Sequence, residues 1–216
     1  MLQLDDVTKR YGRRTVLAPT NVHIDRGLTL LTGPSGGGKS TLLRLIATAE
    51  RASHGSITWA GLPPRRSRRA IRKLLGYAPQ AVDLPEDLTA REFALHIAAL
   101  KGLELRGADR QFLAISEAIG IHGDIGNRIA TFSGGMRRRL IFAQALLGNP
   151  ELLVLDEPTS ELDLETASRL TALLIERSKD AVVIMTSHLV DGVREHASAL
   201  MHMEAGVLRN LVGQHQ

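Results

Sequence analysis

The sequence predicts an α/β fold built around a mainly parallel sheet. Apolar runs of four or five residues have the length expected of strands buried on both faces, and they occupy residues 28–31, 152–155 and 181–185. Segments with helical spacing alternate with these runs, at residues 42–46, 136–147 and 164–178. Because parallel strands need a crossover connection, this alternation indicates a parallel sheet covered by helices on both sides.

Shorter strand-like runs are predicted in the first part of the chain, at residues 2–4, 15–17, 21–24, 55–61 and 74–78. Gly12, Pro19 and Pro79 punctuate or end them. The pattern then becomes helical over residues 89–126. Thr89 and Glu92 have the spacing of a capping box, and Phe93 and Ile97 follow at helical spacing. A helical insert in an α/β chain is the interpretation that this change favours.

The composition is that of a globular protein. With 216 residues, the chain can bury one sizeable core. No stretch approaches the roughly 18 unbroken apolar residues that would span a bilayer, and the N-terminus does not resemble a signal peptide. The sequence contains no cysteine, which excludes disulfides and thiolate metal sites. The eight histidines show no metal-ligand spacing. We therefore expect a soluble, cytosolic protein.

The net charge of +4 is concentrated in two arginine-rich clusters, at residues 65–73 and 137–139. A solvated loop or helix face is the simplest interpretation of the first cluster. Contact with anionic lipid headgroups or with a partner protein remains an alternative. Few aromatic residues lie among these charges, so base stacking is poorly supported and no nucleic-acid partner is expected.

The strongest motif is G-x-x-x-x-G-K-S, placed between a predicted strand and a predicted helix. In that context it predicts a phosphate-binding loop, because glycines let backbone N–H groups surround an anion and the helix adds its positive dipole end. Lys39 would reach the terminal phosphates, and the Ser40 hydroxyl would bind Mg²⁺. The nucleotide-binding segment comprises Gly33, Pro34, Ser35, Gly36, Gly37, Gly38, Lys39, Ser40 and Thr41.

Two acidic residues follow the predicted buried strand at residues 152–155. Ligands of parallel sheets collect at the carboxyl ends of the strands, where Asp156 and Glu157 lie. Asp156 could hold the same Mg²⁺ as Ser40, and Glu157 could orient and deprotonate an attacking water. Ser133, ahead of two glycines and a helix, predicts a second anion site, since helix N-termini present free N–H groups.

Together these motifs resemble the ATP-binding subunits of ABC transporters. The resemblance rests on the phosphate loop, Phe132 to Met136, Leu152 to Pro158, Ser160 to Asp163 and His188, in that order. It implies a P-loop NTPase core with an N-terminal antiparallel β subdomain and an inserted α-helical subdomain. It also implies one ATPase domain over residues 1–216, with residues 1–80 and 150–216 forming the core and about 85–147 the helical subdomain with the signature.

The resemblance assigns further roles within one subunit. Tyr11 matches the aromatic residue that stacks on adenine. Gln80 matches the glutamine that touches Mg²⁺ and water and senses the membrane partner. His188 matches the histidine that contacts the γ-phosphate. With Glu157 and Lys39, His188 would form the catalytic group for Mg²⁺-dependent ATP hydrolysis.

Other matching residues imply a head-to-tail dimer with two ATP molecules between the subunits. Ser133, Gly134 and Gly135 match the signature that grips the γ-phosphate of ATP bound to the opposite subunit. Asp163 matches the acid that crosses the interface. Two departures from the family pattern bear on this geometry: Met136 stands where glutamine is usual, and Glu161 where a small residue is usual. Neither removes a catalytic group, so hydrolysis is still expected.

The implied partners are an integral membrane transporter subunit and a second ATPase subunit, either an identical copy or a close paralogue. The chain would then lie in the cytoplasm, peripherally on the inner face of the cell membrane, and the Met-containing signature favours an exporter. A soluble ABC ATPase of DNA repair or translation is the alternative, but such proteins usually carry long coiled-coil insertions or two ATPase units. A P-loop kinase or GTPase would leave the Ser-Gly-Gly signature and His188 unexplained.

Overall fold

The computed structural model describes residues 1–81, 83–160, 162–187 and 191–212. Its strands are β1 (Leu2–Tyr11), β2 (Arg14–Ile24), β3 (Gly27–Thr32), β4 (His54–Trp59), β5 (Leu75–Ala78), β6 (Leu152–Leu155), β7 (Val182–Thr186), β8 (Ala199–Glu204) and β9 (Val207–Val212). Its α-helices are α1 (Lys39–Ile46), α2 (Pro64–Leu74), α3 (Ala90–Leu100), α4 (Leu105–Ala118), α5 (Gly134–Leu146), α6 (Leu164–Ser178) and α7 (Asp191–Arg194). Short 3₁₀ helices are η1 (His122–Asp124) and η2 (Ile129–Thr131).

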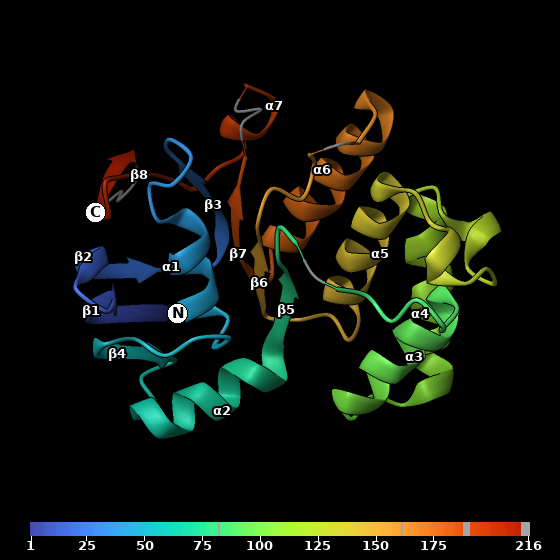
Figure 1. Cartoon of the computed structure of the whole chain (residues 1–216), viewed down its shortest axis with the longest axis horizontal. Helices are drawn as coiled ribbons and strands as arrows, with labels where there is room; N and C mark the ends of the chain where they lie inside the picture. Colours follow the sequence, from blue (N-terminus) through green and yellow to red (C-terminus); the bar gives the residue numbers. More distant parts are fainter. Residues whose placement is uncertain (82, 161, 188–190, 213–216) are drawn as a thin grey trace.

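The larger sheet has six strands among the described residues, in the order β5-β6-β7-β3-β8-β9. Every neighbouring pair is parallel except β8 and β9. The predicted α/β fold with a mainly parallel sheet is therefore confirmed. The carboxyl ends of β3, β6 and β7 lie at one edge of this sheet (Figure 1), which brings together the loops that carry the predicted site residues.

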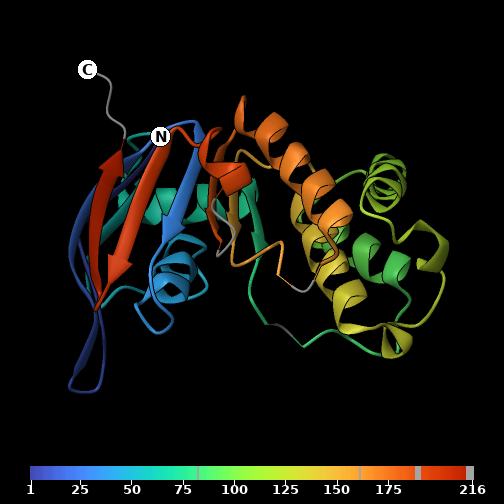
Figure 2. The same cartoon turned by 90° about the horizontal axis from the view of Figure 1, so that it is seen from above.

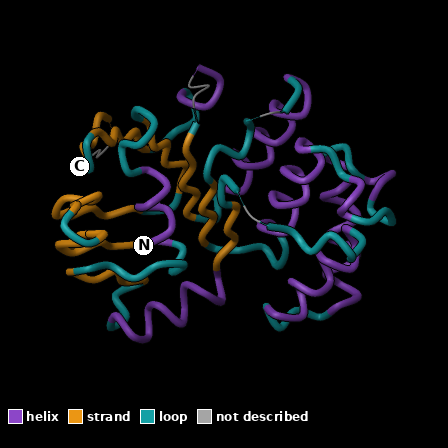
Figure 3. The backbone as a smooth tube through the Cα atoms, in the orientation of Figure 1, coloured by secondary structure: helices purple, strands orange, loops and turns teal. Residues whose placement is uncertain are grey.

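The smaller sheet is antiparallel and has the order β2-β1-β4. The three short N-terminal runs prove to be parts of two long strands, because β1 and β2 pair along most of their length from Leu2↔Ile24 to Tyr11↔Arg14. Figure 3 shows the strands gathered on one side of the molecule and most of the helices on the other. The antiparallel sheet inferred from the resemblance is present.

Alternate residues of the parallel strands face two different apolar clusters. On β6, Leu152 and Val154 join the cluster of α1 and the antiparallel sheet, whereas Leu153 and Leu155 join the cluster of α5 and α6. Helix α1 thus packs between the two sheets, and α5 and α6 cover the opposite face. This pattern explains the continuous apolar runs, since both faces of each strand are buried.

The predicted helical region contains α3, α4 and η1. The capping box at the start of α3 is confirmed, because Thr89 accepts the Glu92 N–H at 3.2 Å and Glu92 accepts the Thr89 N–H at 2.8 Å. Helices α3, α4 and α5 lie at the end of the molecule remote from the antiparallel sheet (Figure 2). No helix in the described part of the chain is both long enough and apolar enough to cross a bilayer.

The first arginine-rich cluster forms helix α2, which packs through Ser67 and Ile71. Arg68 and Arg72 donate hydrogen bonds to the carbonyl and hydroxyl oxygens of Thr48, at 3.2 and 3.1 Å. Burial lowers the pKa of Arg68, and the neighbouring charges of Arg72 and Arg51 add to the effect. The solvated helix face expected from the sequence is observed, and its charge is not balanced by any acidic residue within α2.

Candidate functional site

The predicted phosphate loop connects β3 to α1. Gly33, Gly36 and Gly38 have positive φ angles of 134°, 74° and 109°, conformations that L side chains rarely adopt. Pro34, Ser35 and Gly36 are exposed, whereas the last turn before α1 is buried. The loop therefore has the turn that glycine permits and a surface that an anion can reach.

Residues near the end of β8 support this loop from behind. A Cβ atom on Gly33 would lie 2.0 Å from the carbonyl oxygen of Met203, and one on Gly37 would lie 2.8 Å from the same oxygen. The Gly206 N–H donates to the Gly37 carbonyl at 3.0 Å. This support could not be predicted from the sequence, because β8 and the turn after it carry no motif and reach the loop only in the folded chain.

Lys39 is buried, with 8% of its surface exposed. Its ammonium group donates to the carbonyl oxygens of Gly33 and Pro34, at 2.8 and 3.0 Å. The charge is thus held over the loop that would receive the phosphates. Ser40 and Thr41 follow in the first turn of α1. This turn is the positive end of the helix dipole.

The acid pair is fixed by Thr186, the last residue of β7. The Thr186 hydroxyl donates to Asp156 Oδ1 at 2.8 Å and accepts the Glu157 N–H at 2.7 Å. Asp156 is only 3% exposed. Glu157 has a φ of 52°, a left-handed conformation that is costly for a residue with a side chain. One threonine hydroxyl therefore holds both acids in their conformations.

Gln80 lies beside the predicted catalytic base. Its amide nitrogen donates to Glu157 Oε2 at 3.2 Å, and its carbonyl oxygen accepts a hydrogen bond from Arg138. The structure therefore brings together Gln80, after β5, and Glu157, after β6, and Arg138 links the Gln80 backbone to helix α5.

The donors present fit Mg²⁺, which prefers hydroxyl and carboxylate oxygens. Asp156, the residue after β6, presents a carboxylate that is almost wholly buried, and a nearby cation would offset the cost of burying its negative charge. Ser40 lies at the start of α1 and is partly exposed. Among the described residues no group of three histidine, cysteine or acidic side chains could hold a metal.

The second predicted anion site is the start of α5. Ser133 caps this helix, its hydroxyl accepting the Met136 N–H at 3.3 Å. Ser133 and Gly134 are exposed. The Met136 side chain packs against the cluster that contains α5 and α6. The departure from the usual glutamine thus places an apolar side chain on the core.

The run of arginines in α5 is not a free basic patch. Arg137 pairs with Glu86 at 2.8 Å, Arg138 bonds the Gln80 carbonyl, and Arg139 donates to Asp163 Oδ2 at 3.3 Å. Asp163 also caps α6 through Thr166. Hydrogen bonds from the backbone and hydroxyl of Thr166 lower the pKa of Asp163, and the charge of Arg139 adds to this. The helix that follows the signature is therefore tied to three neighbouring segments.

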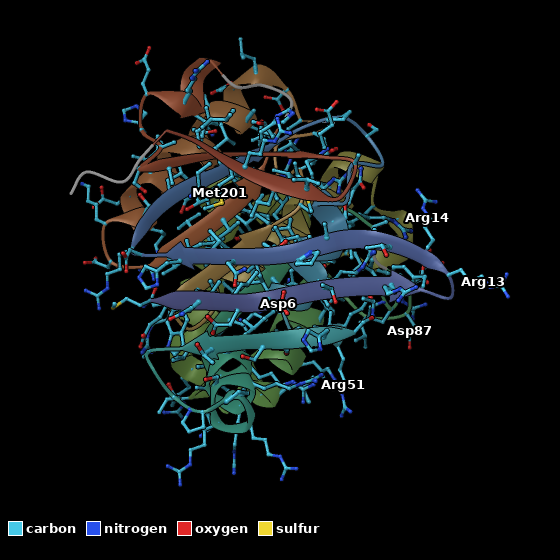
Figure 4. The ribbon with its side chains drawn as sticks, turned by 90° about the vertical axis from the view of Figure 1, so that its left-hand side faces the viewer. Asp6, Arg13, Arg14, Arg51, Asp87 and Met201 are labelled. Atoms are coloured by element: carbon cyan, nitrogen blue, oxygen red, sulfur yellow. The ribbon has the colours of Figure 1, made fainter. Side chains whose placement is uncertain are left out.

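Tyr11 lies apart from this cluster. Tyr11 ends β1 near the tip of the β1–β2 hairpin, with 45% of its surface exposed. The hairpin tip is marked by Arg13 and Arg14 in Figure 4. His188, and Glu161 of the second departure, fall outside the described residues.

We expect Thr186→Val to destabilise the protein. The variant keeps the shape of the side chain but leaves Asp156 and the Glu157 N–H without their hydroxyl partner, and such a loss costs about 1–3 kcal/mol. Urea denaturation should show the fall in the free energy of unfolding. Thr186→Ser, which keeps the hydroxyl, is the matched control. Equal stability of the two variants would show that the hydroxyl does not hold the acid pair.

A glycine-rich loop between a parallel strand and a helix, with an acid pair at the end of a neighbouring strand, defines a P-loop nucleotide-binding protein. The family model for ABC transporters matches residues 17–160. The chain therefore belongs to the ABC transporter family.

Curated relatives agree with this assignment. The chain is 32% identical over 210 residues to the Nod factor export ATP-binding protein I of Rhizobium etli, covering 95% of this chain and 66% of that protein. It is 31% identical over 195 residues to a linearmycin resistance ATP-binding protein of Bacillus subtilis, covering 89% and 63%. The chain thus spans about two thirds of the length of these relatives.

Solved structures share the fold. An ATP-binding subunit of an ABC transporter superposes with a TM-score of 0.88 at 24% identity, covering 98% of this chain and 90% of that one. A dimeric ATP-binding cassette in a post-hydrolysis state, bound to ADP and Pi, superposes with a TM-score of 0.86 at 23% identity, covering 99% and 100%. The predicted P-loop NTPase core is therefore confirmed as a fold.

Proposed function

We propose that this chain is the ATP-binding subunit of an ABC transporter and that it hydrolyses ATP in a head-to-tail dimer. The observation that carries the proposal is that the two helices with predicted anion-binding N-termini pack on opposite faces of the parallel sheet. Helix α1, behind the phosphate loop, packs in one apolar cluster, and α5, behind Ser133, packs in the other. Two such sites can enclose one triphosphate if the second comes from a partner subunit.

Each residue near the phosphate loop has a role that its surroundings favour. Lys39 can move its ammonium group from the loop carbonyls to the terminal phosphates. Glu157, placed by Thr186 and Gln80, can orient water and take its proton. Ser40, Gln80 and Asp156 would hold Mg²⁺, which supplies charge neutralisation at the phosphates when bound. His188 would complete the contacts to the γ-phosphate.

Residues contributed across the interface would be Ser133, Gly134, Gly135 and Asp163. The exposed start of α5 supports this role, since its N–H groups are open to a ligand outside the subunit. The dimeric state of a structural relative points in the same direction. Closure of the dimer would then depend on ATP, and hydrolysis would release it.

The membrane partner would dock on the helical part of the chain, at about residues 85–147. The Arg138 bond to the Gln80 backbone supports a role in coupling the membrane partner to the hydrolytic site. Gln80 contacts both Glu157 and helix α5, so movement of the segment after β5 would displace contacts of both. The names of the relatives, Nod factor export and linearmycin resistance, favour export as the direction of transport. Location on the inner face of the membrane follows from this partner, and the cationic α2 face suits an anionic surface.

An affinity-tagged Glu157→Gln variant, solubilised from membranes with ATP present, should copurify with an integral membrane protein. The variant is chosen because slow hydrolysis would keep the ATP-bound complex assembled. The same pull-down without nucleotide is the control. Recovery of ribosomes or DNA in place of a membrane protein would contradict the transport role and favour a soluble ABC ATPase.

A further inference from the structure

The carboxylate of Glu50 joins β1 to the helix behind the phosphate loop. Its Oε1 accepts a hydrogen bond from Arg44 Nε of α1 at 2.6 Å. Its Oε2 lies 3.0 Å from the Lys9 ammonium and accepts the hydroxyl of Tyr11. Lys9 and Tyr11 both belong to β1. One side chain therefore holds β1 and α1 together.

The cluster is partly shielded from water and keeps Glu50 charged. The side chains of Lys9 and Glu50 are 14% and 24% exposed. Burial raises the pKa of Glu50, but hydrogen bonds from Tyr11 and Lys9, with the charge of Arg44, bring the net pKa below its usual value. An ionised carboxylate is the stronger acceptor, so these bonds are charge-assisted.

The tyrosine ring is held at a second point as well. The Lys9 ammonium lies 4.8 Å from the centre of the Tyr11 ring, and it donates to the Arg51 carbonyl at 2.8 Å. Figure 4 shows Arg51 toward the same end of the antiparallel sheet as the hairpin tip. The hydroxyl and the ring of Tyr11 are therefore both restrained, although 45% of the residue is exposed.

The contacts continue toward the phosphate loop. Arg44, whose Nε binds Glu50, donates through its terminal nitrogen to the Thr41 hydroxyl at 3.2 Å. Thr41 follows Ser40 in the first turn of α1. A continuous set of side-chain bonds thus runs from Tyr11 through Glu50 and Arg44 to the residue next to the proposed Mg²⁺ ligand.

We propose that Glu50 is a positioning residue that fixes Tyr11 relative to the phosphate loop, so that the base and the triphosphate of one nucleotide are bound together. This inference rests on the proposed function, in which Tyr11 contacts the adenine. Ordering one side chain before binding removes an entropic cost at the moment of binding. Loss of Glu50 should therefore weaken the contacts of the protein with the base of ATP. The contacts with the phosphates should be unchanged.

The test compares ATP with inorganic tripolyphosphate, which carries the phosphates but no base. With Mg²⁺ present, Glu50→Ala and Tyr11→Phe should each raise the Kd for ATP roughly 3- to 10-fold and leave the Kd for tripolyphosphate unchanged. The Tyr11→Phe variant keeps the ring and the Glu50 ion pairs, so it isolates the hydroxyl contact. The double variant should have no higher Kd for ATP than the single variant with the higher Kd. Both changes remove the same hydrogen bond between Tyr11 and Glu50, so their effects should not add. Glu176→Gln, an exposed change on α6, is the matched control.

Two results would overturn the inference while leaving the proposed function intact. One is a Tyr11→Ala variant that loses ATP affinity while Glu50→Ala and Tyr11→Phe do not. The other is an equal loss of ATP and tripolyphosphate affinity in Glu50→Ala, which would mean that Glu50 acts on the phosphate loop alone. If Tyr11→Ala leaves ATP binding unchanged, the role of Tyr11 in the proposed function fails and the inference fails with it.

Discussion

Glu157→Gln should bind ATP as tightly as the wild type but turn it over at least about 100-fold more slowly, since positioned acid–base groups contribute on the order of 10²–10⁴ in rate. The amide has nearly the shape of the carboxylate and can keep the contact with Gln80. It cannot take a proton from water. Steady-state phosphate release and nucleotide titration measure the two quantities separately.

The same variant should accumulate as a dimer in ATP, because the closed state forms and is not released. Size-exclusion chromatography with and without ATP would show this shift, and the specific activity of the wild type should rise with protein concentration. Glu176→Gln applies the same chemical change at an exposed position and should have neither effect. Near wild-type turnover in Glu157→Gln would contradict the assignment of the base.

Lys39→Ala should lose ATP affinity by roughly 10- to 100-fold, the loss expected for hydrogen bonds to a charged group. The ammonium group lies over the phosphate loop through its bonds to Gly33 and Pro34, so its removal takes a positive side-chain charge away from the predicted phosphate site. Isothermal titration with ATP and Mg²⁺ measures the change.

Lys179→Ala, which removes an exposed lysine paired with Glu176, is the matched control and should bind ATP normally. The stability of Lys39→Ala should be checked by thermal denaturation, because Lys39 is buried. An unchanged ATP titration in a folded Lys39→Ala variant would refute the phosphate-binding role of the loop.

Most of the correct predictions were based on patterns of residues that lie close together in the sequence. The strand at 152–155 and the helix at 164–178 have the predicted bounds, because periodicity and end signals lie within each segment. The boundaries of β1 and β2 were less well predicted, since polar residues interrupt the apolar runs although the backbone pairing continues. Strands β8 and β9 carry no local motif, and the sequence did not predict them.

The sequence by itself determined the α/β fold class, the phosphate loop and the acid pair, because each depends on neighbouring residues whose spacing is visible in the chain. Only the tertiary structure decided what holds them in place. Thr186 reaches Asp156 across adjacent strands, Met203 lies behind the glycine loop, and Glu50 joins Tyr11 to α1. These contacts join residues that are far apart in the sequence, and no spacing rule connects such residues before the sheet forms.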